Sequence, residues 1–209
     1  MCNKNGKVYV ASMNLRGEWY PLPEDCKRVN VTSSQQKDSP YRKTFSPMTA
    51  IKGGYKGYHC FENYWQAGKR YENMNDDDTD YLVNWWKNQK KGHRKYPFSK
   101  GKKVIHAIFP DYDNPLDYIP SRKLIYVPEY YELIKDTKTL NKLKENLKLG
   151  INYVIYDFDG PRLIDGKVNI MEVNISNLKE KINDPKFPFG HGYVVAAALL
   201  DISPKDYID

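Results

Sequence analysis

Long apolar runs are missing from this sequence of 209 residues. No stretch approaches the roughly 18 consecutive apolar residues that a membrane-spanning helix requires. The opening residues, MCNKNGKVYV, also lack the apolar segment of a secretory signal. We therefore expect a cytoplasmic protein that does not interact with a membrane.

Cysteine is scarce and irregularly spaced. Cys2, Cys26 and Cys60 form no Cys-x-x-Cys pair and no Cys/His spacing, which argues against a disulfide framework and against a structural zinc site. The Gly-rich phosphate loop, the dinucleotide-binding Gly-x-Gly-x-x-Gly, His-Glu-x-x-His and Gly-x-Ser-x-Gly are all absent from the sequence. These absences argue against the common nucleotide hydrolases, dehydrogenases, zinc proteases and α/β-hydrolases.

Basic residues exceed acidic ones, with 33 Lys and Arg against 26 Asp and Glu and a formal net charge of +7. Much of the excess lies in residues 87–103, the basic stretch, whose cationic members are Lys87, Lys90, Lys91, Arg94, Lys95, Lys100, Lys102 and Lys103. Tyr96 and Phe98 lie among them. Basic residues interleaved with aromatic ones suit a nucleotide-like small molecule or a nucleic acid. A solvated basic loop is the alternative interpretation.

We predict an α+β fold in one compact domain spanning residues 1–209, because this length suits a single core and 40% of the residues are hydrophobic. Alternating apolar positions predict N-terminal strands at residues 7–12 and 28–32, and residues 151–158 give the clearest strand pattern. Residues 33–44 are polar and contain Pro40, which predicts a loop. Helical patterns are found at residues 61–71, 76–92, 128–135, 136–150, 176–181 and 193–200.

The predicted core combines the apolar face of the helix at 61–71, the strand at 151–158 and the apolar segment near the C-terminus. Its members are Phe61, Tyr64, Trp65, Val154, Tyr156, Val194, Val195, Ala198 and Leu199.

Glu62 is the first candidate for catalysis, because it lies one residue after the start of the aromatic-rich helix predicted at residues 61–71. A carboxyl group surrounded by aromatic rings is desolvated, which favours its protonated form and suits it for general acid catalysis. The alternative is that Glu62 only complements the helix dipole.

Four further polar residues, in two segments of the chain, are candidates for a site. Asp157 and Asp159 lie at the end of the strand predicted at 151–158, where sites are common, although turn formation is an alternative role. We expect only one of the two to face any given site. Arg162 is a candidate phosphate ligand or a partner for one aspartate. His191, between two glycines at a predicted helix start, offers backbone N–H groups to an anion, unless the glycines serve close packing.

Two segments, FSPM at residues 45–48 and GYHCFENYWQAGK at residues 57–69, resemble the opening of the NADAR family, also known from YbiA-like proteins. The positions that match this pattern in order are Glu62, Tyr64, Trp65, Gln66, Ala67 and Lys69. Family members usually carry a later Trp-Gly-Asp-Gly. The closest counterpart in this chain is residues 157–160, Asp-Phe-Asp-Gly, which lack the tryptophan.

The resemblance implies an N-glycosidase that acts on the ribosyl C–N bond of a nucleotide-like or ADP-ribosylated substrate. Glu62 would act as general acid or base, and Asp157 or Asp159 would stabilise an oxocarbenium-like transition state. The candidate substrate-binding residues on this interpretation are Tyr64, Trp65, Gln66, Lys69 and Arg162. His191 is added to them because of its position at a predicted helix start. This chemistry requires no metal or other cofactor. The alternative function is a non-enzymatic basic protein that binds nucleic acid or a host factor through residues 87–103.

Overall fold

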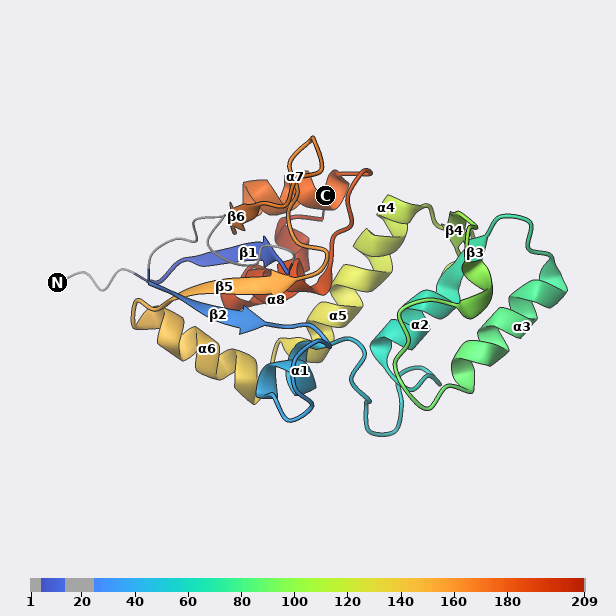
Figure 1. Ribbon diagram of the computed structural model, residues 1–209, viewed down its shortest axis with the longest axis horizontal. Helices are drawn as coiled ribbons and strands as arrows, with labels where there is room; N and C mark the ends of the chain where they lie inside the picture. The colour runs from blue at the N-terminus through green and yellow to red at the C-terminus, as the bar shows by residue number, and fades with distance from the viewer. Residues whose placement is uncertain (1–4, 14–24, 209) are drawn as a thin grey trace. The chain divides into compact units, whose positions relative to one another are not determined.

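Within the residues that the computed structural model describes, 5–13 and 25–208, one sheet has four strands and another has two. The chain divides into two units (Figure 1). Unit 1 combines Met1–Ser46 with Val127–Asp209, and unit 2 is Pro47–Tyr126. Each unit contains helices and strands, so the predicted α+β class is confirmed.

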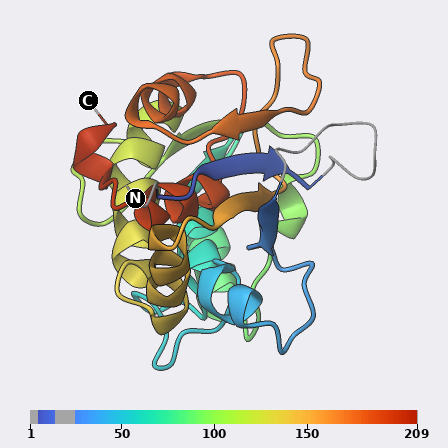
Figure 2. The same cartoon turned by 90° about the vertical axis from the view of Figure 1, so that its left-hand side faces the viewer.

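The four-stranded sheet of unit 1 has the order β2-β5-β1-β6. Its strands are β1 (Val8–Ser12), β2 (Cys26–Asn30), β5 (Asn152–Asp157) and β6 (Ile170–Glu172). β5 pairs in parallel with β1 and β2, whereas β6 is antiparallel to β1. In Figure 2 the blue strand β1 and the orange strand β5 run side by side in the same direction. The strand predicted at 151–158 is therefore confirmed as a central strand. Both predicted N-terminal strands are also present, the second as the edge strand Cys26–Asn30 instead of residues 28–32.

Helix α8 (His191–Leu199) is buried along its whole length and packs on β1 and β5. It also contacts α5 (Val127–Ile134) and α6 (Lys138–Lys148). A helix that is apolar on all sides belongs inside a core, which is the position that its sequence predicts. Every residue predicted for the core is buried.

The prediction of a loop at residues 33–44 is wrong at its end, because α1 spans Pro40–Phe45. Pro40 occupies the first turn, where an amide N–H has no intrahelical partner and its absence costs nothing. The Ser39 side chain accepts a hydrogen bond from the backbone N–H of Arg42 and caps the helix. The remaining helical elements of unit 1 are α7 (Ile175–Asn183) and the short η3 (Pro204–Asp206).

Unit 2 places α2 and α3 beside a two-stranded antiparallel sheet. Its elements are α2 (Phe61–Gly68), β3 (Lys69–Tyr71), α3 (Asp76–Lys87), η1 (Pro97–Ser99), β4 (Val104–Ala107), α4 (Tyr118–Ser121) and η2 (Arg122–Tyr126). A capping box in which Asn75 and Asp78 exchange side-chain and backbone hydrogen bonds starts α3. None of the helices in the described part of the chain has the length and apolar character needed to cross a membrane.

Helix α2 ends at Gly68, three residues before the predicted end at residue 71. A Cβ at Gly68 would lie 2.3 Å from Cζ of Phe109, so this close contact requires glycine. The Arg70 guanidinium donates hydrogen bonds of 2.8, 3.0 and 3.0 Å to the carbonyl oxygens of Ala67, Gly68 and Lys69. These bonds engage carbonyl groups at and just after the end of α2, where intrahelical partners are missing; the Gly68 carbonyl also accepts from the backbone N–H of Ile108. The chain then continues as β3.

Candidate functional site

A cavity of about 520 Å³ in unit 2 is lined by α2, β3 and the basic stretch. We call it the basic pocket, after its cationic lining residues Lys69, Arg94, Lys95, Lys100 and Lys102. Its lining, as far as the structure describes it, contains no acidic residue. Sites for small molecules typically occupy roughly 300–1,000 Å³, and a lining of one charge sign concentrates ligands of the other sign. The basic pocket therefore suits an anionic small molecule.

Gln66 connects the basic pocket to Glu62. Gln66 lines the pocket, and its Nε2 donates a hydrogen bond of 2.7 Å to Oε1 of Glu62. Glu62 lies in the first turn of α2, where the helix dipole favours negative charge. Both interactions favour the carboxylate over the neutral acid, which is the form that a general base must have before it takes a proton.

Tyr64 and Trp65 form the packed face of α2, with exposed fractions of only 3% and 8%. The Trp65 ring stacks on Phe109 at 5.7 Å between centroids, and the Tyr64 ring lies 5.3 Å from the same ring. The ammonium of Lys69 lies 5.6 Å from the Trp65 ring centroid, a cation–π distance. These contacts fix the orientation of α2 and place Lys69 at the pocket; stacking of either aromatic residue on a ligand stays a prediction.

Asn63 of α2 fixes the basic stretch in place. Its side-chain amide donates to the carbonyl of Lys91 at 2.9 Å and accepts from the backbone N–H of His93 at 3.1 Å. Between these two residues, a Cβ at Gly92 would lie 2.6 Å from the carbonyl oxygen of Met48. The start of the pocket-lining segment is therefore anchored to the helix that carries Glu62 and Gln66.

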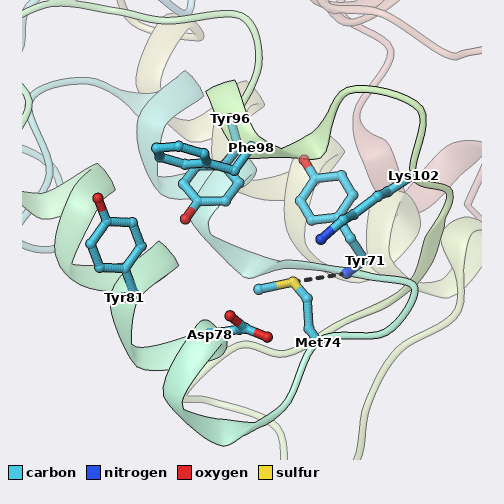
Figure 3. Close-up of a pocket in the computed structure, with 7 residues that line it drawn as sticks. All are labelled: Tyr71, Met74, Asp78, Tyr81, Tyr96, Phe98 and Lys102. Atoms are coloured by element: carbon cyan, nitrogen blue, oxygen red, sulfur yellow. Dashed lines mark hydrogen bonds between the residues drawn. The ribbon is translucent and has the colours of Figure 1, made fainter.

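A second cavity, of about 230 Å³, adjoins the basic pocket and shares Tyr71, Tyr96 and Lys102 with it. We call it the aromatic pocket. Figure 3 shows its lining residues, Tyr71, Met74, Asp78, Tyr81, Tyr96, Phe98 and Lys102, around a common space. Burial raises the pKa of Tyr96, with a further contribution from the neighbouring Tyr81, Asp78 and Tyr71, so its hydroxyl stays neutral at physiological pH.

Asp157 and His191 lie together in unit 1, at the carboxyl end of β5. Oδ2 of Asp157 accepts a 2.7 Å hydrogen bond from the backbone N–H of Gly192 and lies 3.2 Å from Nδ1 of His191. A Cβ at Gly190 would lie 2.4 Å from Oδ2 of Asp157, and one at Gly192 would lie 2.6 Å from its Cβ. The glycines thus serve close packing, and the anion at the start of α8 is the protein's own carboxylate.

Asp157 is buried, whereas Asp159 is exposed. The reason is the turn: residues two apart on a regular strand share a face, and β5 ends at Asp157. Nη1 of Arg162 donates a 3.2 Å hydrogen bond to the carbonyl of Gly166. Arg162 thereby supports the turn that follows β5.

The structure brings Glu62, Gln66 and Lys69 together in unit 2, and Asp157 with His191 in unit 1. The sequence reasoning missed Tyr71, Met74, Asp78 and Tyr81 as lining residues. A signal for them existed in the aromatic residues on both sides of the acidic start of α3. Their convergence with Tyr96 and Phe98 depends on the pairing of β3 with β4, which sequence periodicity does not specify.

Among residues 5–13 and 25–208, no group of three or more His, Cys, Asp or Glu side chains is arranged to hold a metal ion. Comparison with known proteins found no matching family model, no similar curated protein and no similar solved structure. The functional interpretation therefore depends on the geometry of the site.

Proposed function

We propose that this protein binds a nucleotide-like ligand by its phosphate groups in the basic pocket and hydrolyses an N-glycosidic bond with Glu62 as general base. The observation that carries the proposal is the position of Gln66, which lines the basic pocket and donates a hydrogen bond to Glu62. A ligand held by its phosphates at this pocket would thus be close to a carboxylate.

The cationic lining supports phosphate as the bound group. Lysine provides point charges and arginine a bidentate donor, and both bind phosphate oxygens. Lys95, Lys100 and Lys102 are exposed around the pocket and come from one short segment, with Gly101 between the last two at a φ of +80°. This conformation suits glycine and turns the segment so that it presents several charges to one cavity.

The proposed reaction needs one proton acceptor beside the ribosyl carbon. Water would attack this carbon while the C–N bond breaks and its electron pair leaves with the base nitrogen, which takes a proton from solvent. Glu62 would take the proton from the attacking water, a role that requires the carboxylate form that the Gln66 hydrogen bond and the helix start favour. Asp157 takes no part in the proposed reaction, because its carboxylate already caps α8 and contacts His191.

The alternative function, binding of nucleic acid or a host factor by a non-enzymatic protein, would favour basic residues on an open face. An enzyme instead gathers them around a concave site. Arg94, Lys95, Lys100 and Lys102 line one cavity with Gln66, which supports the enzyme. Lys87, Lys90 and Lys91 are exposed outside that lining, so they serve as the comparison set for binding experiments.

The proposal is tested by incubating the protein with nucleotides, riboflavin precursors and ADP-ribosylated bases and separating the products by chromatography. The expected result is a released free base and an equal amount of the ribosyl product from at least one substrate. If the unmodified protein cleaves none of them, and an oligonucleotide binds it more tightly than any mononucleotide, the binding-module alternative replaces the enzyme.

A further inference from the structure

The aromatic pocket is small and shares three lining residues with the basic pocket. Its volume of about 230 Å³ lies below the roughly 300–1,000 Å³ of drug-sized ligand sites, so it suits a single ring system. Tyr71, Tyr96 and Lys102 belong to both cavities. A ligand with phosphate in the basic pocket therefore has a second, differently lined compartment within reach.

The rings of the aromatic pocket meet at steep angles. Tyr96 and Phe98 lie 5.4 Å apart with 66° between their planes, and Tyr81 and Phe98 lie 5.9 Å apart with 63°. Tyr71 and Tyr96 are nearly parallel, at 6.3 Å and 22°. Tyr71 and Tyr96 are buried, whereas Tyr81 and Phe98 are exposed, so the last two are the rings that can offer a face or an edge to a flat ligand ring. Figure 3 shows Tyr81 and Tyr71 on opposite sides of the opening.

The charges around the aromatic pocket favour a neutral base over an organic cation as its ligand. A cation in an aromatic pocket would gain from the rings and from Asp78 but would lie beside Lys102. The adjoining basic pocket adds Lys69, Arg94, Lys95 and Lys100, so cationic side chains outnumber the single carboxylate in the described linings of the two pockets. A neutral heteroaromatic ring gains the same stacking without this repulsion, and its N–H groups have an acceptor in the Asp78 carboxylate.

We propose that the aromatic pocket holds a neutral heteroaromatic base with an N–H donor edge, belonging to the ligand whose phosphate lies in the basic pocket. This inference rests on the proposed function and names its substrate class. The base is a recognition element and not the leaving group, because Gln66, which contacts Glu62, lines the basic pocket and is absent from the described lining of the aromatic pocket. The substrate class is a base joined through phosphate to the reacting riboside.

Calorimetric titration of the full chain with adenosine 5′-monophosphate, ribose 5-phosphate, adenosine and choline tests this assignment. Tyr81 and Phe98 are 56% and 57% exposed, so Tyr81→Ala and Phe98→Ala are expected to leave the fold intact. Each variant is expected to weaken binding of the monophosphate about 5- to 100-fold, the range that loss of base stacking produces. Binding of ribose 5-phosphate should not change in either variant. Phe98→Trp keeps an aromatic ring at this position and should bind the monophosphate about as tightly as the unmodified protein does.

Tyr118→Ala is the matched control, because Tyr118 is an exposed tyrosine of unit 2 outside both pocket linings. Equal affinity of the unmodified protein for adenosine 5′-monophosphate and ribose 5-phosphate would overturn the base subsite, and so would choline binding that depends on Tyr81. If neither phosphate binds but adenosine does, in a manner that Phe98→Ala abolishes, the base subsite stands and the proposed function fails. Absence of binding by adenosine and both phosphates overturns both.

Discussion

The side-chain amide of Gln66 donates a 2.7 Å hydrogen bond to the Glu62 carboxylate, across one turn of α2. Gln66 is buried, whereas Glu62 is half-buried. A fixed donor on a carboxylate holds its position and its charge. Through this bond the wall of the basic pocket orients the proposed general base.

Replacement of Gln66 by leucine removes this donor while keeping a side chain of similar size. We expect turnover to fall about 10-fold or more, because a hydrogen bond to a charged group contributes about 1.5–3 kcal/mol. Steady-state kinetics on a cleaved substrate provide the measurement. Gln89→Leu, which removes a side-chain bond to the carbonyl of Trp85 outside the pocket, is the control. Equal turnover in both variants would contradict a role for Gln66 in orienting Glu62.

The lysines that line the basic pocket should contribute more to pyrophosphate binding than the lysines outside it. Lys95→Ala and Lys100→Ala are each expected to weaken pyrophosphate binding about 3- to 10-fold at low salt, with a smaller effect at high salt because exposed charges are screened. Lys90→Ala removes an exposed lysine of the same stretch outside the pocket lining and should change binding little. Calorimetry at two salt concentrations makes the comparison. Equal losses in all three variants would indicate a diffuse charge effect.

Much of the fold follows from periodicity in the sequence. The central strand β5 and the buried helix α8 were predictable because their apolar residues fill a strand or surround a helix completely. The end of α2 was not predictable, because it depends on Phe109 filling the space above Gly68 and on the Arg70 guanidinium. Both are tertiary contacts, which the local sequence pattern does not predict.

The candidate site was predictable only in part. The charge of the basic stretch and the positions of Gln66 and Lys69 on α2 were visible in the sequence, but the cavity they share requires the anchoring of residues 91 and 93 by Asn63. For Asp157 the sequence predicts a site, but the structure gives this residue a role in packing. A carboxylate at a strand end is typical of a site, yet its oxygen is bound by Gly192 and His191, from a helix distant in sequence.

Removal of the Asp157 charge should destabilise unit 1. Asp157→Asn weakens the cap of α8 and the contact with His191, at a cost of about 2 kcal/mol in the free energy of unfolding, typical for a buried hydrogen bond to a charged group. Asp159→Asn changes an exposed carboxylate and should cost less than about 1 kcal/mol. Urea denaturation of both variants provides the values. A larger loss for Asp159→Asn would contradict the structural role of Asp157.

The buried thiol of Cys60 should make the free energy of unfolding fall as the pH rises. Burial raises its pKa from the ordinary value of 9.0 to about 11, so the folded protein keeps the proton where the unfolded chain loses it. The stabilisation is complete below pH 9 and declines by about 1.4 kcal/mol per pH unit as the pH rises toward 11. Cys60→Ala should therefore lose less stability between pH 9 and 11 than the unmodified protein. Parallel curves in thermal unfolding across that window would contradict the burial of this thiol.

The most direct test of the proposed function compares turnover by Glu62→Gln with turnover by the unmodified protein on the same substrate. Glutamine keeps the size of the side chain but cannot accept a proton, so we expect the turnover number to fall about 100-fold or more while ligand affinity and stability change little. Glu72→Gln, at a half-buried glutamate that accepts from the backbone N–H of Lys103, is the control and should retain turnover. Turnover by Glu62→Gln equal to that of the unmodified protein would contradict the assignment of Glu62 as the base.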